Sequence, residues 1–210
     1  MPNRPRFSAG EIASMRDASR IGHTAWDNNP RLDSLKQKLK EFGKLKTSHH
    51  CCYCMRDLYG EFNMVLDIEH ILPKSKFPKF MFTGRNLAVS CKRCNMFIKK
   101  SRIDFLVPPL FIGRERVFKS RYYQFIHPNL DNYEAHLLRS AVHAGRKVIV
   151  KYRVVSGSAK GRFTYDYFKL EYLERNSFDG AQGGRGRPEI RNAIIESDFN
   201  ALVESMLYGR

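Results

Sequence analysis

The chain has 210 residues, a hydrophobic content of 42% and a formal net charge of +16. This composition supports a packed core and excludes an intrinsically disordered protein. The excess of 37 basic over 21 acidic residues predicts a polyanionic partner. The start of the chain has no apolar signal segment and no apolar run reaches the length of a membrane span, so we expect a soluble, cytoplasmic protein without membrane contact.

Two helices are predicted in the first segment, residues 1–48. Ser8 and Glu11 have the spacing of a capping box, which predicts a short helix that begins after Ser8. Asn29 and Pro30 favour the start of a second helix at Pro30. Proline has no backbone N–H, and in the first turn of a helix that group would have no partner within the helix. We expect this second helix to end at Gly43, since glycine is common at helix ends.

Trp26 and three lysines are the residues of this segment that invite a functional interpretation. Trp26 is the only tryptophan of the chain, and we interpret it as a core residue rather than as a platform on which a base stacks. Lys36, Lys38 and Lys40 lie away from the apolar stripe of the second helix. They form either a solvated face or a contact with phosphate, and the sequence leaves both options open.

Four cysteines form two CxxC pairs, and a long stretch of sequence separates them. Four soft thiolates in two tight turns suit a tetrahedral structural zinc ion. A redox role is the alternative, but two pairs in one small region favour a metal. We expect Cys52 to be a buried thiol, and His49 and His50 to lie beside the site. The predicted zinc ligands are Cys51, Cys54, Cys91 and Cys94.

The stretch between the cysteine pairs predicts two short strands and a helix. Polar and apolar residues alternate from residue 66, which indicates a strand that Pro73 ends. Glu69 and His70 would point to opposite faces of a regular strand, so a shared site requires the strand to end or bend there. A short apolar run at 87–89 is expected to pair back. A helix that begins at residue 94 or 95 would then follow.

This combination of CxxC, Glu-His with Ile-x-Pro, Asn, and CxxC-Asn with a following lysine resembles the HNH family of His-Me finger endonucleases. The match is to the subtype with a four-cysteine zinc site, and it covers residues 49–102. The resemblance implies a ββα-metal finger in which two short strands, a long loop and a helix are fastened by zinc. The whole layout is similar to stand-alone HNH nucleases of bacterial anti-phage defence systems such as Septu and Zorya.

The resemblance also implies a role for each matching residue. His70 becomes the general base that takes a proton from the attacking water, and Asn86 holds the loop and orients the His70 ring. Glu69 and Asn95 become ligands of a catalytic divalent ion. Family members often have histidine where this chain has Asn95, and an amide ligand favours a hard ion such as Mg²⁺ or Mn²⁺.

Other charged residues near the motif have less specific expected roles. Asp67 is a competing carboxylate on the same strand face as Glu69, and we expect it to be structural or to act outside the metal's direct ligands. Basic side chains around the motif are expected to contact the phosphates of nucleic acid. These are Lys74, Lys76, Lys99, Lys100 and Arg102.

The remaining segment, residues 107–210, has mixed signals. His127, Asp131 and His136 suggest either a metal site or, as we favour, a helix cap and packed core residues. Residues 147–155 predict a strand, and residues 162–172 are either its hairpin partner or a helix. Residues 176–187 form a Gly/Arg-rich loop that suits a linker.

Together these features predict an α+β protein in which a zinc-braced ββα finger lies in a mostly helical surround, with a C-terminal hairpin as one option. The expected division is an N-terminal helical segment 1–48, the finger 49–106 and an α/β extension 107–210. The expected activity is metal-dependent cleavage of DNA with low sequence specificity, in anti-phage defence or restriction and with a defence partner protein. A non-catalytic zinc module that binds nucleic acid and an RNA-directed nuclease are the alternatives. The sequence does not indicate the oligomeric state.

Overall fold

The computed structural model describes residues 5–62, 64–107, 116–144, 147–176, 197 and 201. Within them the protein combines helices with two small antiparallel sheets, so the expected α+β class is confirmed. The longer elements are α1 (Ala9–Ile21), α2 (Thr24–Asn28), α3 (Asp33–Lys46), β1 (Leu66–His70), β2 (Leu87–Cys91), η4 (Arg93–Lys99), β3 (Leu137–Ala144), β4 (Lys147–Val154), α5 (Ala159–Tyr167) and β5 (Arg175–Asn176). The short 3₁₀ turns are η1 (Pro30–Leu32), η2 (Pro78–Phe80), η3 (Gly84–Asn86), η5 (Ser120–Tyr122), η6 (Tyr133–Ala135), η7 (Val155–Gly157) and η8 (Leu170–Leu173).

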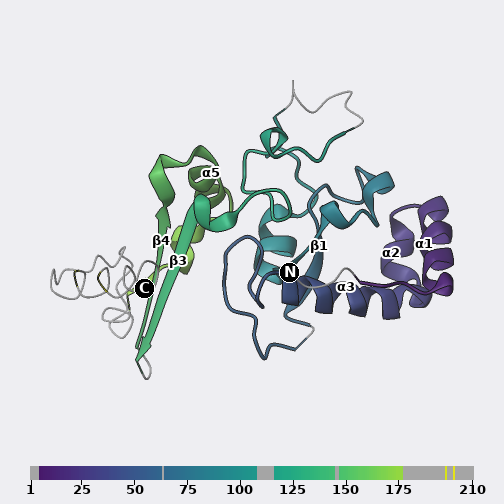
Figure 1. Ribbon diagram of the computed structural model, residues 1–210, viewed down its shortest axis with the longest axis horizontal. Coiled ribbons are helices and arrows are strands. Elements are labelled where there is room, and N and C mark those ends of the chain that lie inside the picture. The colour runs from purple at the N-terminus through teal and green to yellow at the C-terminus, as the bar shows by residue number, and fades with distance from the viewer. Residues whose placement is uncertain are drawn as a thin grey trace.

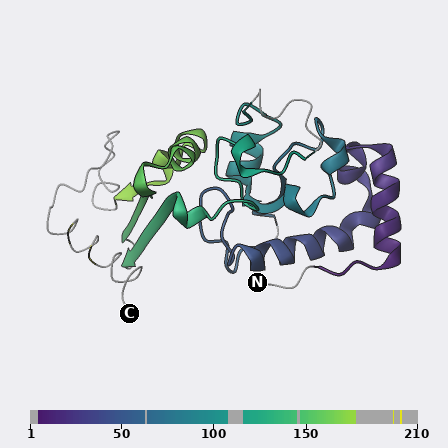
Figure 2. The same cartoon turned by 45° about the horizontal axis from the view of Figure 1, so that its top comes forward.

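The N-terminal helices lie at one end of the molecule and the β3–β4 hairpin at the other, with β1 between them (Figure 1). The turned view shows the long helix α3 running along the central part of the molecule (Figure 2). None of the helices in the described residues combines the length and the apolar character that crossing a bilayer requires.

The capping box at the start of α1 is confirmed. The Ser8 hydroxyl accepts a hydrogen bond from the Glu11 N–H at 3.2 Å, and the Glu11 carboxylate accepts one from the Ser8 N–H at 2.7 Å. Glu11 also accepts a hydrogen bond from Lys38 of α3 at 2.8 Å. The hydrogen bond from Lys38, followed by that from the Ser8 N–H, lowers the pKa of Glu11 to about 2. The capping carboxylate therefore joins α1 to α3.

The expectation that Gly43 ends the second helix is wrong, because α3 continues through it to Lys46. A Cβ atom at position 43 would lie 2.3 Å from Cγ2 of Val89 in β2. Glycine is therefore needed here for the close approach of the helix to the sheet, and it is not a stop signal. The contact fixes α3 against β2.

The central sheet consists of β1 and β2, which pair in the antiparallel sense with Ile68 opposite Val89 and His70 opposite Leu87. The helix η4 follows β2 directly and is a π-helix. Arg93 at its start donates hydrogen bonds to the carbonyls of Phe168 and Lys169 at 2.9 and 2.8 Å. These contacts join η4 to the C-terminal part of the chain.

The C-terminal part contains more strand than expected, so the surround of the central sheet is helical mainly on its N-terminal side. The strand β4 pairs with β3 on one side and β5 on the other, whereas residues 162–172 fall in α5 and η8. The helix cap expected at Asp131 is absent, since only a single 3₁₀ turn precedes β3. Of the Gly/Arg-rich loop predicted at 176–187, residues 177–187 lie outside the described part of the chain.

Two clusters of buried apolar side chains form the interior. The smaller cluster belongs to the N-terminal helices and includes Trp26, Leu32, Leu35 and Met81. The larger cluster runs from the four-cysteine region through Phe105 and Phe125 to Phe168. Residues on both sides of the boundary predicted at 106 thus share one core, while the domain division itself stays a prediction.

Candidate active site and zinc site

The four predicted zinc ligands lie together in the interior. Their Sγ atoms are all within 4.8 Å of one another, and they form the one group of this kind found among the described residues. The sulfurs of Cys54 and Cys91 are 3.8 Å apart. A tetrahedron with Zn–S bonds of about 2.3 Å has edges of about 3.8 Å, so the donor set fits zinc. We conclude that the cysteine cluster can hold a metal ion as expected.

Backbone hydrogen bonds shape the first cysteine turn. The Met55 N–H donates to the Cys51 carbonyl at 2.9 Å, and the Cys91 N–H donates to Cys51 Sγ at 3.3 Å. Cys52 is buried as expected but lies outside the cluster, and burial raises the pKa of its thiol. His49 and His50 are not part of the cluster either.

Two tyrosines from the C-terminal part of the chain also hold this turn. The hydroxyl of Tyr133 donates to the carbonyl of Tyr53 at 2.9 Å, and the hydroxyl of Tyr152 donates to the carbonyl of Cys54 at 2.5 Å. Two carbonyls of the cysteine turn therefore find donors outside the predicted finger.

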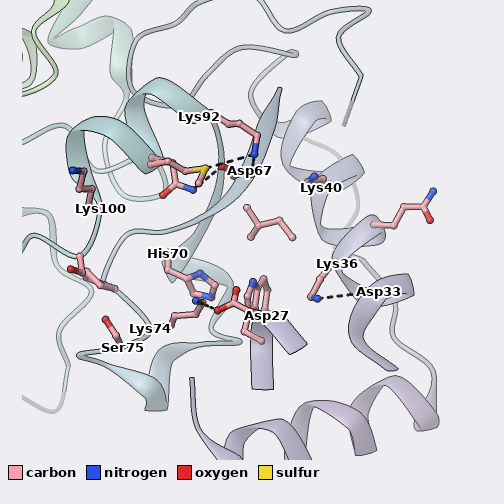
Figure 3. Close-up of a pocket in the computed structure, with 17 residues that line it drawn as sticks. Asp27, Asp33, Lys36, Lys40, Asp67, His70, Lys74, Ser75, Lys92 and Lys100 are labelled. Atoms are coloured by element: carbon pink, nitrogen blue, oxygen red, sulfur yellow. Dashed lines mark hydrogen bonds and ion pairs between the residues drawn. The ribbon is translucent and has the colours of Figure 1, made fainter. Parts of the chain in front are cut away.

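A cavity of about 770 Å³ opens beside the cysteine cluster, between α3 on one side and β1 and η4 on the other (Figure 3). Five lysines and three aspartates give its wall a net positive charge. The lining residues are Trp26, Asp27, Asp33, Lys36, Gln37, Lys40, Asp67, Ile68, His70, Pro73, Lys74, Ser75, Lys92, Asn95, Met96, Lys100 and Ser101.

His70 lies at the end of β1 and lines this cavity, although only 8% of the residue is exposed. Its Nε2 is 3.1 Å from the carbonyl of Met81, and the edge of Trp26 packs on the ring with centroids 4.5 Å apart. Burial lowers the pKa of His70 to about 4, so the ring is neutral at pH 7. A neutral ring that donates Nε2–H to a carbonyl keeps an unprotonated Nδ1. His70 therefore has the protonation state of a general base.

Asn86 is fully buried behind His70. Its side-chain oxygen accepts from the Leu72 N–H at 2.7 Å, and its amide donates to the carbonyls of Leu72 and Phe80 at 3.0 and 3.1 Å. Asn86 thus joins Leu72, near the start of the loop between β1 and β2, to Phe80 within that loop. Phe80 directly precedes Met81, whose carbonyl lies against His70.

Glu69 points away from the cavity into the interior. Its Oε1 is 2.7 Å from Lys99 Nζ and accepts a hydrogen bond from Tyr53 at 3.1 Å. Its Oε2 has no hydrogen-bond partner among the described residues. Burial raises the pKa of Glu69, and this outweighs the lowering effects of Lys99 and Tyr53. The unpartnered Oε2 is an atom that a cation could use.

Asp67 shares the strand face of Glu69 but opens onto the cavity, as does Asn95. The Asn95 amide donates to Asp67 Oδ2 at 3.3 Å, and Lys92 lies 3.5 Å from Asp67 Oδ1. The structure therefore places Asn95 directly against Asp67, whereas it pairs Glu69 with Lys99. The carboxylates of Asp67 and Glu69 thus both contact residues of η4, Asp67 near its start and Glu69 at its end.

The five predicted phosphate-binding residues occupy different environments. Lys74 and Lys100 line the cavity, while Lys76 and Arg102 do not. Lys99 is fully buried, with its ammonium donating to the carbonyl of His70 at 2.9 Å in addition to its pair with Glu69. Only Lys74 and Lys100 of this set are therefore placed at the cavity.

The candidate C-terminal metal trio does not form a ligand cluster in the structure. The Asp131 carboxylate accepts from the His127 N–H at 2.7 Å and pairs with Lys160 at 2.6 Å. His136 Nδ1 lies 2.7 Å from the Ser158 hydroxyl. These side chains are packed and hydrogen-bonded, as we favoured from the sequence, although the helix cap expected at Asp131 is absent.

Sequence reasoning did not identify α3 as part of this site. Lys36 and Lys40 have the spacing of one helix face, but the nearby sequence did not indicate that this face lies across the cavity from His70. The contact between Trp26 and His70 likewise joins residues far apart in the chain.

Among curated proteins, the Septu protein PtuB of Bacillus thuringiensis is similar to this chain. The two are 26% identical over 210 residues, which is 100% of this chain and 68% of the relative. No protein-family model and no solved structure matches the chain.

Proposed function

We propose that this protein is a metal-dependent HNH endonuclease that hydrolyses phosphodiester bonds in DNA. The observation that carries the proposal is the cavity itself, into which a neutral histidine, a carboxylate and an amide open among five lysines. The order β1, β2 and η4, with the cysteine cluster beside them, agrees with the family that the sequence resembles. Similarity to a Septu protein supports a role in anti-phage defence with a partner protein.

In the proposed reaction His70 takes a proton from the attacking water. The hydrogen bond to the Met81 carbonyl fixes the ring and leaves Nδ1 as the accepting atom. Asn86 holds the loop that presents this carbonyl. Lys74 and Lys100 at the rim bind the phosphates on either side of the scissile bond.

The oxygen donors at the junction of β1 and η4 are of the kind that a hard divalent cation prefers. Asn95 would offer its side-chain oxygen from the cavity side, and Glu69 would offer its unpartnered Oε2 from the interior. Asp67, which already touches Asn95, is the competing carboxylate. Such a cation would stabilise negative charge on the phosphate and on the departing oxygen.

The test is a cleavage assay on supercoiled plasmid with Mg²⁺ or Mn²⁺, which compares the wild type with His70→Ala and Asn95→Ala. We expect His70→Ala to lose at least about 100-fold in rate, the order of magnitude for a general base. Asn95→Ala should also slow cleavage, because it removes a proposed ligand of the cation. Zinc content measured on each protein controls for folding. Cleavage by His70→Ala at the wild-type rate would contradict the proposal. Parallel reactions on RNA of the same sequence would show whether the enzyme prefers DNA.

A further inference from the structure

The side of α3 that faces the cavity carries a polar stripe at helical spacing. Asp33, Lys36, Gln37 and Lys40 occupy positions i, i+3, i+4 and i+7, which share one side of a helix. All four line the cavity. Figure 3 shows Lys36 and Lys40 on α3, across the gap from His70 and Asp67. This stripe therefore faces another part of the protein.

The position of this stripe is fixed by packing. Gly43, about two turns after Lys36, brings the helix into contact with Val89 of β2, because no Cβ atom separates them. Lys36 lies over the ring of Trp26, with Nζ 6.0 Å from the ring centroid. The stripe is consequently held opposite β1 and η4 as a wall.

The charges across the cavity are complementary to a polyanion. Lys40 is partly buried, which lowers the pKa of its ammonium, and the charges of Asp67 and Lys92 on the opposite wall act on it in opposite directions. Bringing the lysines of α3 together with Lys92 and Lys100, which flank η4, costs repulsion that a bound anion would relieve. Cations on both walls suit a phosphodiester backbone that passes between them.

We propose that α3 forms the second wall of the DNA-binding cleft, so that Lys36 and Lys40 bind the phosphate backbone while His70 acts on it from the opposite side. The inference rests on the proposed function in its choice of DNA as the ligand. It adds that residues outside the predicted finger contribute directly to substrate binding.

The first test is the salt dependence of DNA binding without added divalent ion, which separates binding from cleavage. Each phosphate contact contributes about 0.9 to the slope of log affinity against log salt on duplex DNA, so Lys36→Gln/Lys40→Gln should lower the slope by about 2. The matched control is Lys38→Gln/Lys44→Gln, which removes the same charge from α3. Lys36 pairs with Asp33, and the control lysines likewise pair with Glu11 and Glu41, but the control lysines do not line the cavity. The control should leave the slope unchanged.

Trp26 provides a second readout, because the only tryptophan of the chain lines the cavity. We expect duplex DNA to change the tryptophan fluorescence of the wild type and of the control. The change should be lost in Lys36→Gln/Lys40→Gln and restored in Lys36→Arg/Lys40→Arg.

The outcomes separate the two proposals. Equal slopes for the cavity variant and the control would overturn the role of α3, even if cleavage still depends on His70. A lower slope only in the cavity variant supports α3, even if no cleavage is found and the proposed function fails. A wild type that binds no DNA at low salt would overturn both.

Discussion

Asp67 and Glu69 show how two similar residues acquire different roles from their surroundings. They lie two residues apart on one face of β1, yet Asp67 opens onto the cavity and Glu69 is fully buried against Lys99. The strand alternation places both toward η4. The two carboxylates differ because η4 places Asn95 against Asp67 and Lys99 against Glu69.

Lys99 and its neighbour Lys100 test whether the buried pair is structural. We expect Lys99→Met to destabilise the protein by about 3–5 kcal/mol, because it leaves the Glu69 carboxylate buried without its charge partner. Lys100 is exposed, so Lys100→Met should change the free energy of unfolding by less than about 0.5 kcal/mol. Urea unfolding of the three proteins measures both values. Equal stability of the two variants would refute the structural role of Lys99.

The carboxylate that binds the catalytic cation can be identified by Mn²⁺ titration, followed by electron paramagnetic resonance. If Glu69 is the ligand through its unpartnered Oε2, Glu69→Gln should weaken Mn²⁺ binding by at least roughly tenfold, while Asp67→Asn should have a smaller effect. The reverse order would assign the site to Asp67 and Asn95. Zinc content and thermal unfolding of each variant serve as controls.

Among the helices and strands, those whose formation depends on nearby residues in the sequence were predicted correctly. The capping box of Ser8 and Glu11 and the pairing of 66–70 with 87–91 follow from spacing and alternation, and both were found. The continuation of α3 through Gly43 could not be predicted, since its cause is Val89 in a distant strand. The strand β3 was missed because its pairing partner, β4, outweighed a helical signal around Asp131.

Gly43 and Gly10 give a matched pair of substitutions. Gly43→Ala should destabilise the protein by about 1–3 kcal/mol, because the new methyl group would overlap buried Val89. Gly10→Ala in α1 meets nothing closer than 3.9 Å and should stabilise by about 0.4–1 kcal/mol. Thermal unfolding followed by circular dichroism measures both. A stabilising effect of Gly43→Ala would show that α3 can move away from β2.

For the molecule as a whole, the sequence predicted the four cysteines that lie together and several residues on the finger side of the cavity, among them His70, Lys74, Asn95 and Lys100. It did not reveal that the cavity needs α3, or that the cysteine region and the C-terminal segment share one core. Both features arise from contacts between residues that are distant in the chain, for which a single sequence carries no periodic signal.

Removal of zinc should affect more than the cysteine turns. Because all four ligands belong to the larger core, a chelator or Cys91→Ser should unfold the central sheet and the packing of α5 together. Near-ultraviolet circular dichroism and measured zinc content test this. A metal-free protein that keeps its near-ultraviolet spectrum and its unfolding temperature would exclude a structural metal.

Acid should destabilise the protein through His127. Burial lowers the pKa of this residue from its ordinary value of 6.5 to about 3. The unfolded state therefore binds the proton first, and the contribution of His127 is complete above pH 6.5 and is lost as the pH falls toward 3. It amounts to roughly 5 kcal/mol at most. In unfolding measured at several pH values, His127→Gln should flatten this dependence, whereas substitution of exposed His23 should leave it as steep as in the wild type.

The hydrogen bonds from Tyr133 and Tyr152 to the cysteine turn make residues 49–106 depend on the C-terminal part of the chain. An excised fragment 49–106 would leave the carbonyls of Tyr53 and Cys54 without these donors and would expose Phe105 to water. Transplanting the motif into another scaffold would therefore require the partner tyrosines as well. Shortening the chain from its C-terminal side is therefore constrained as far as Tyr152 in β4.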